Sequence, residues 1–121
     1  MEKELVRNKV IKSLKKYTGH DDVFLSSRGN KAIFAALKLV KKTSRKSIIL
    51  MPGQGGWITY PQYAKKLGFD IKTLDTDYGV MKLDALKENI KDAAAVIYSN
   101  PAVYYAEQPV TEIYELCRKN N

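Results

Sequence analysis

The sequence predicts an α/β fold, a three-layer αβα arrangement with a mainly parallel sheet. Helical periodicity recurs five times, short apolar runs lie between the helical segments, and those runs are apolar almost throughout rather than alternating. Continuous apolar runs of this kind are typical of strands that are buried on both faces. Strands that alternate with helices require right-handed crossovers, and therefore an open parallel sheet covered by helices.

Each of the five predicted helices carries apolar residues about one turn apart, so each can bury a single stripe against a core. The third is followed directly by Gly68, a residue that commonly ends helices. The stripes are formed by Val6, Val10, Leu14 and Tyr17; by Ile33, Ala36, Leu37 and Val40; by Tyr60, Tyr63, Ala64 and Leu67; by Leu83, Leu86 and Ile90; and by Val110, Ile113, Tyr114 and Cys117.

The three predicted strands are residues 47–51, 70–74 and 93–99. The first ends at Pro52-Gly53 and the last at Asn100-Pro101, and both dipeptides favour a turn. No internal repeat or linker separates these elements. We therefore expect residues 1–121 to form one domain, with an N-terminal helix over 1–19 and a body over 20–119.

The composition excludes several classes of protein. No apolar run approaches the 20 or so residues that a membrane span requires, and the mixed-charge start Met1-Glu2-Lys3-Glu4 is unlike a secretory signal. The single cysteine, Cys117, cannot form an internal disulfide, and no cluster of His and Cys residues points to a metal. We expect a soluble, cytoplasmic protein without a membrane partner or a metal.

The net charge of +8 is concentrated in the first part of the chain. Residues 1–46 hold 13 basic and 4 acidic side chains, a balance of +9, whereas residues 47–121 hold 8 and 9, a balance of −1. Such basic helices can bind nucleic acid or another polyanion, or can simply be solvated. The residues that would form this basic surface are Lys12, Lys15, Lys16, Lys38, Lys41 and Lys42.

The first of three candidate loops, Ser26-Ser27-Arg28-Gly29-Asn30, directly precedes the second predicted helix. A helix start offers free N–H groups and the positive end of the helix dipole, and Arg28 adds a fixed charge. The loop could hold a phosphate. The alternative is a helix cap that binds nothing.

The second loop runs from Pro52 to Trp57 and contains three glycines, which allow the backbone to approach a ligand closely. Its glycine spacing fits neither the dinucleotide fingerprint nor a nucleotide P-loop. The indole of Trp57 could stack on a planar ring, or it could anchor the loop to the next helix.

The third loop is Ser99-Asn100-Pro101, which closes the last predicted strand. The Asn100 amide could orient a polar ligand atom, or it could serve only to begin a turn. In open α/β sheets ligands bind beyond the carboxyl ends of the strands, where such loops converge.

Taken together, the loops resemble the first half of the large domain of fold type I pyridoxal-phosphate (PLP) enzymes, the aspartate aminotransferase superfamily, and its sugar aminotransferase (DegT/DnrJ/EryC1/StrS) branch in particular. The resemblance covers residues 20–119, which would form a PLP-transferase-like half-domain. The matching segments are Ser27-Arg28-Gly29-Asn30-Lys31-Ala32, Pro52-Gly53-Gln54-Gly55-Gly56-Trp57, Leu67-Gly68, Asp77-Tyr78-Gly79 and Val96-Ile97-Tyr98-Ser99-Asn100-Pro101.

The resemblance implies a cofactor, pyridoxal 5′-phosphate, and a role for each loop. Ser27, Arg28, Gly29 and Asn30 would hold the cofactor phosphate, although Arg28 stands where the family usually has a small residue. Trp57 would stack on the pyridine ring, and Asn100 would hydrogen-bond near the phenolic oxygen.

The resemblance also implies residues that this sequence does not contain. The family pairs an aspartate with the pyridine nitrogen and forms a Schiff base with a lysine in a Ser-x-x-Lys setting. The one Ser-x-x-Lys spacing here, from Ser13 to Lys16, lies in the predicted N-terminal helix, and no lysine in the segment that resembles the family, residues 20–119, stands in that setting. Without that amine and carboxylate the cofactor is a poor electron sink.

We therefore expect a truncated or split aminotransferase-like domain with no catalytic residue of its own. A second chain supplying the C-terminal half, or a second copy, would pair the open edge of its sheet. The alternative function is a non-catalytic basic module that binds a polyanion.

Overall fold

The computed structural model describes residues 1–120, which form two compact units, residues 1–32 and residues 33 onward. The first unit contains helix α1 (Glu2–Thr18), which ends at Gly19 in the left-handed conformation (φ 73°), and the start of helix α2 (Gly29–Thr43). No side chain of α1 is buried. No helix among the described residues is long and apolar enough to cross a membrane.

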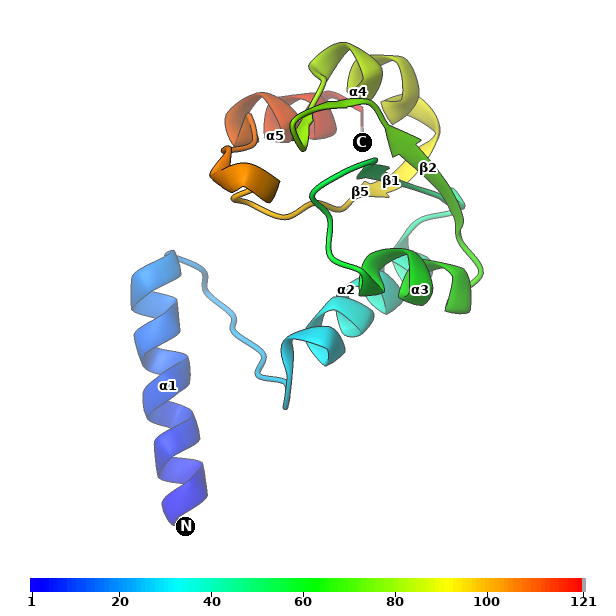
Figure 1. The fold of residues 1–121 in the computed structure, drawn as a ribbon. Helices are drawn as coiled ribbons and strands as arrows, with labels where there is room; N and C mark the ends of the chain where they lie inside the picture. The colour runs from blue at the N-terminus through cyan, green and yellow to red at the C-terminus, as the bar shows by residue number, and fades with distance from the viewer. Residues whose placement is uncertain (121) are drawn as a thin grey trace. The chain divides into compact units, whose positions relative to one another are not determined.

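The second unit is built on a three-stranded parallel sheet with the order β2-β1-β5. Figure 1 shows the ribbon of this unit, with α2 and α3 on one face of the sheet and α4 and α5 on the other. The predicted αβα fold class is confirmed. The remaining elements are β1 (Ile48–Pro52), α3 (Thr59–Lys66), β2 (Asp70–Leu74), α4 (Leu83–Asn89), a 3-10 turn (Ile90–Asp92), β5 (Ala93–Val96), a second 3-10 turn (Val103–Tyr105) and α5 (Val110–Lys119).

Each face of the sheet has its own hydrophobic core. On the α2–α3 face, Ile49 and Met51 of β1 pack with Leu37, Tyr60 and Ala64. On the other face, the core is formed by Leu50, Leu74, Met81, Leu86, Ile90 and Ile113. Successive residues of β1 therefore enter opposite cores, as strand geometry requires. This is why β1 is apolar at every position.

Strand β2 differs from the prediction that the strands are buried on both faces. Asp70, Lys72 and Thr73 are exposed and Leu74 is buried. The reason is its place at the end of the sheet, where it pairs with β1 alone among the described strands. An edge strand has one neighbour fewer to cover it.

A short β-hairpin was not predicted. Strands β3 (Thr76–Asp77) and β4 (Val80–Met81) pair antiparallel, and the two-residue turn between them has positive φ at both Tyr78 (47°) and Gly79 (84°). Positive φ at both central residues defines the type I′ turn, whose twist matches that of a hairpin.

Candidate functional site

The glycine-rich loop leaves the carboxyl end of β1 and packs closely on its neighbours. The Gly53 N–H donates to the Leu74 carbonyl oxygen (2.9 Å), and a Cβ at Gly53 would lie 3.3 Å from that oxygen. Gly55 has φ +85°, and a Cβ there would lie 3.2 Å from the Val103 nitrogen. Packing alone therefore accounts for the glycines at 53 and 55.

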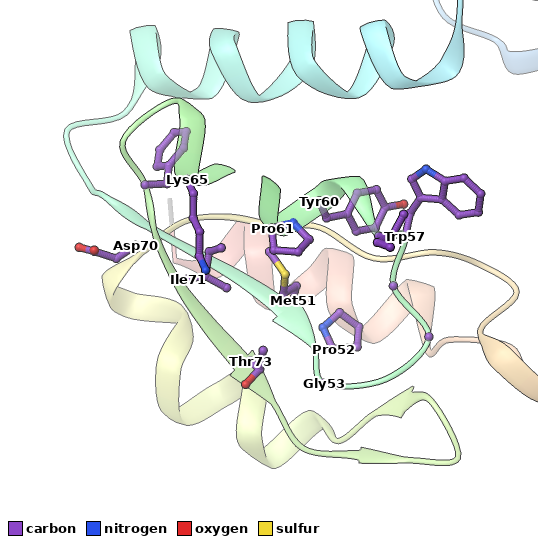
Figure 2. A pocket seen from close by; sticks show the side chains of 14 residues that line it. Met51, Pro52, Gly53, Trp57, Tyr60, Pro61, Lys65, Asp70, Ile71 and Thr73 are labelled. Atoms are coloured by element: carbon purple, nitrogen blue, oxygen red, sulfur yellow. The ribbon is translucent and has the colours of Figure 1, made fainter. Parts of the chain in front are cut away.

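Trp57 lies at the end of this loop, and its side chain is 55% exposed. It borders a cavity of ≈ 580 Å³ between α3 and β2, together with Pro52, Tyr60 and Ile71. Figure 2 shows the indole at one end of this cavity and the side chains of α3 above strand β2. Residues of the edge strand β2 line part of the cavity, and Asn100 is not among the residues that line it.

The loops that carry Trp57 and Asn100 meet at one edge of the sheet. They leave the neighbouring parallel strands β1 and β5 at the same end. The Tyr60 hydroxyl, three residues after Trp57, lies 3.1 Å from the Ser99 Oγ, next to Asn100. It also donates to the Tyr98 carbonyl oxygen at 3.5 Å. Two of the three predicted loops are therefore brought together in this unit.

Asn100 is exposed, and its side-chain oxygen already has a partner. The backbone N–H of Gln108 donates to the Asn100 Oδ1 (2.9 Å), across a turn that contains the cis peptide bond between Asn100 and Pro101. Asn100 therefore stabilises this turn, which is one of the two roles that the sequence allows for it. The amide nitrogen of Asn100 is a donor that can face a ligand, and the oxygen, which accepts one hydrogen bond, keeps a second lone pair.

Gln108 is a buried polar residue that sequence reasoning missed. Its side chain is 5% exposed and makes two hydrogen bonds to the β3–β4 hairpin. The Met81 N–H donates to Gln108 Oε1 (2.8 Å), and Gln108 Nε2 donates to the Gly79 carbonyl oxygen (2.9 Å). Gln108 therefore fastens the hairpin to the segment that follows Asn100. A single glutamine before a helix has no spacing or charge signal that would reveal this contact.

The Ser27–Asn30 loop belongs to the first compact unit, so it is described by itself. The Arg28 carbonyl oxygen accepts from the N–H groups of Lys31 (3.0 Å) and Ala32 (3.1 Å), which begins helix α2. The Ser26 hydroxyl donates to the same carbonyl (2.8 Å) and does not cap a free N–H. The side chains of Ser27 and Arg28 are exposed. A phosphate role for this loop stays a prediction.

Two titratable groups near the end of β5, Tyr98 and Cys117, have raised pKa values, which makes them less reactive. Burial raises the pKa of the Cys117 thiol, and burial together with the neighbouring Cys117 raises the pKa of Tyr98. The thiol therefore stays protonated at neutral pH and is a poor nucleophile. No group of three or more His, Cys, Asp or Glu side chains in residues 1–120 could hold a metal ion.

Comparisons with known proteins find a distant relative. No family model matches the chain, and no solved structure matches it. The chain is 30% identical over 94 residues to a protein of Desulfovibrio desulfuricans named probable glycine dehydrogenase (decarboxylating) subunit 1. The alignment covers 74% of this chain, which spans about a fifth (21%) of the length of that relative. The chain is therefore distantly related to one segment of a dehydrogenase subunit.

Proposed function

We propose that this chain is the cofactor-holding part of a PLP-type enzyme domain, and that a second polypeptide segment completes its site. One observation carries the proposal. The tryptophan loop and the asparagine turn leave adjacent parallel strands at one sheet edge and are joined there by the contact between Tyr60 and Ser99. Ligands of open α/β sheets bind at such edges.

The residues present fit part of the cofactor. The half-exposed indole of Trp57 is able to stack on a pyridine ring. The amide nitrogen of Asn100 could donate to the phenolic oxygen, and the hydrogen bond from the Gln108 N–H to the Asn100 oxygen would hold the amide in one orientation. The start of α2, with Arg28 beside it, belongs to the other compact unit, and its phosphate role is a separate proposal that rests on the positive end of the helix and the charge of Arg28. Trp57 and Asn100 would bind and orient the cofactor, and neither of them would react with it.

The name of the relative is compatible with this cofactor. Decarboxylation of an amino acid leaves electrons on its α-carbon, and PLP stabilises such a carbanion as an electron sink. The chemistry also needs an amine that forms a Schiff base, for which these residues offer no counterpart in the family's setting. We propose that a second chain supplies it, together with the carboxylate for the ring nitrogen. The relative's name, subunit 1, fits an enzyme built of several chains.

The test is a titration of Trp57 fluorescence. PLP itself reacts with surface lysines, so the ligand is a pyridoxal-phosphate analogue that lacks the aldehyde. We expect saturable quenching, because a stacked ring contacts the only tryptophan in the chain. No quenching at about millimolar ligand, an affinity of roughly 4 kcal/mol, would overturn the proposal.

A pair of variants with the same charge change tests the phosphate role. Arg28→Ala should weaken the analogue about tenfold, since a charge-assisted contact to phosphate is lost. Arg7→Ala removes the same charge from the exposed helix α1 and should leave the affinity unchanged. Equal effects of the two variants would mean that only net charge matters and that Arg28 holds no phosphate.

Polyanion binding is a second candidate, favoured by the exposure of α1. The helix buries no side chain and carries six basic residues, Lys3, Arg7, Lys9, Lys12, Lys15 and Lys16. Neutralisation of phosphates by these side chains would give an affinity for RNA or DNA that falls steeply with salt. A filter-binding assay that retains no nucleic acid at low salt would remove this candidate.

A further inference from the structure

Strand β2 has an outer edge with backbone groups directed away from the sheet. The Asp70 N–H donates to the Ser47 carbonyl oxygen (2.8 Å), and the Leu74 carbonyl oxygen accepts from the Gly53 N–H (2.9 Å). Residues 70 and 74 therefore direct their polar backbone groups toward β1. Because these groups alternate along a strand, Ile71 and Thr73 direct theirs outward. No other strand among the described residues pairs with this edge.

The same two residues line the cavity beside α3. Ile71 and Thr73 form its floor, and Trp57, Pro61 and Lys65 lie around it (Figure 2). A strand added along β2 would therefore hydrogen-bond to Ile71 and Thr73 and place every second side chain on the cavity face. At ≈ 580 Å³ the cavity has room for such side chains.

The charged side chains around the β2 edge determine which kind of partner strand can pair with it. Lys72 is an exposed residue of β2, Lys65 is exposed and lines the same cavity as Ile71 and Thr73, and Asp70 is the acidic residue of β2. A lysine in the middle of an edge strand opposes pairing with a second copy of the same strand, because like charges would meet. It favours a partner strand that carries carboxylates.

We propose that the β2 edge binds an extended acidic peptide whose alternate side chains are apolar. The peptide adds a strand to the sheet next to β2. Its apolar side chains enter the cavity lined by Trp57 and Pro61, and its carboxylates lie near Lys72 on the opposite face. The added strand pairs with β2, whereas the proposed cofactor site lies where β1 and β5 end, and Trp57 borders both.

The probe is a fluorescein-labelled peptide of alternating glutamate and valine, measured by fluorescence anisotropy with the full chain. Two control peptides separate the contributions. One has lysine in place of glutamate, and the other has glycine in place of valine. We expect the acidic alternating peptide to bind at least about tenfold more tightly than either control. Equal binding of the glycine-containing peptide would show charge attraction alone and would overturn the proposal.

A proline substitution tests the added strand directly. Thr73→Pro removes an outward N–H that β1 does not use, and prolines are tolerated at edge strands in that orientation. It should weaken the peptide about tenfold, whereas Thr73→Val, which keeps the N–H, should change the affinity by less than about twofold. Binding to the proline variant that matches the wild type would refute strand addition.

A charge reversal serves where the proline variant fails to fold. Lys72→Glu changes an exposed side chain and should weaken the acidic peptide while it strengthens the lysine-containing one. Unchanged preference between the two peptides overturns the proposal. Light scattering on the chain alone adds one more outcome: self-association that the peptide does not displace would assign this edge to a second copy of the chain and overturn the peptide proposal.

Discussion

The side chain of Gln108 should contribute strongly to the free energy of unfolding, because it is the partner of two buried backbone groups. Gln108→Ala leaves two backbone groups without a partner, the N–H of Met81 (2% exposed) and the carbonyl of buried Gly79. An unsatisfied buried polar group costs about 1–3 kcal/mol. Two of them cost about 3 kcal/mol, a large part of the 5–15 kcal/mol that stabilises a typical domain.

The measurement is urea unfolding, followed by far-UV circular dichroism and by Trp57 fluorescence. Gln108→Met fills most of the same volume but cannot hydrogen-bond, so it separates the lost bonds from the cavity that alanine would leave. Gln62→Ala is the matched control, because Gln62 is an exposed glutamine of α3. We expect it to change the free energy of unfolding by less than about 0.5 kcal/mol. A loss below about 1 kcal/mol for both Gln108 variants would refute the reasoning.

Three further changes test the packing around the site. Gly79→Ala should destabilise the chain by about 2 kcal/mol or more in urea unfolding, because the new Cβ would lie 2.6 Å from Val103 Cγ2 and the backbone there has φ +84°. Adding Val103→Ala removes the clash but not the backbone strain, so it should restore only part of the loss. Tyr60→Phe should cost about 1 kcal/mol by the same measurement, through loss of the contact with Ser99, and no loss would show that the contact is unimportant. Burial raises the pKa of the Cys117 thiol in the folded chain. The stabilisation from the buried, protonated thiol is therefore fully present below the unfolded-state pKa of about 8.5, and it is lost as the pH rises through the folded-state pKa. Cys117→Ala should flatten the fall in the urea midpoint above pH 8.5, and an unchanged slope would contradict the burial argument.

The regular elements were predictable because their signal is local. Apolar residues one turn apart gave all five helices, and β1, β2 and β5 follow from the apolar runs. The predicted third strand, 93–99, is longer than β5, which ends at Val96. Beyond that point the chain still follows β1, since the Ile97 N–H donates to the Leu50 carbonyl. A run of apolar residues indicates burial, whereas the length of a strand depends on its neighbours.

The hairpin and its anchor could not be predicted from the same signals. Strands of two residues are too short to show an alternating pattern, and only the Tyr78-Gly79 pair hints at a turn. The partner that holds the turn, Gln108, is 29 residues away from Gly79 in the sequence. Contacts at that separation depend on the tertiary fold, which composition and periodicity do not encode.

The structure also shows what the glycines of the glycine-rich loop indicate about ligand binding. Gly55 and Gly79 are both packed against Ala102 and Val103, so the loop, the hairpin turn and the segment after Asn100 form one continuous block. Glycines that are required for packing are not by themselves a sign of a ligand. The exposed indole of Trp57 and the amide nitrogen of Asn100 remain the candidates for ligand binding in this unit. Gln108 fastens the hairpin of this block to the segment after Asn100, and the block supports the loops that carry Trp57 and Asn100. A Gln108 variant that stays folded should therefore bind the cofactor analogue more weakly, even though Gln108 would not touch it.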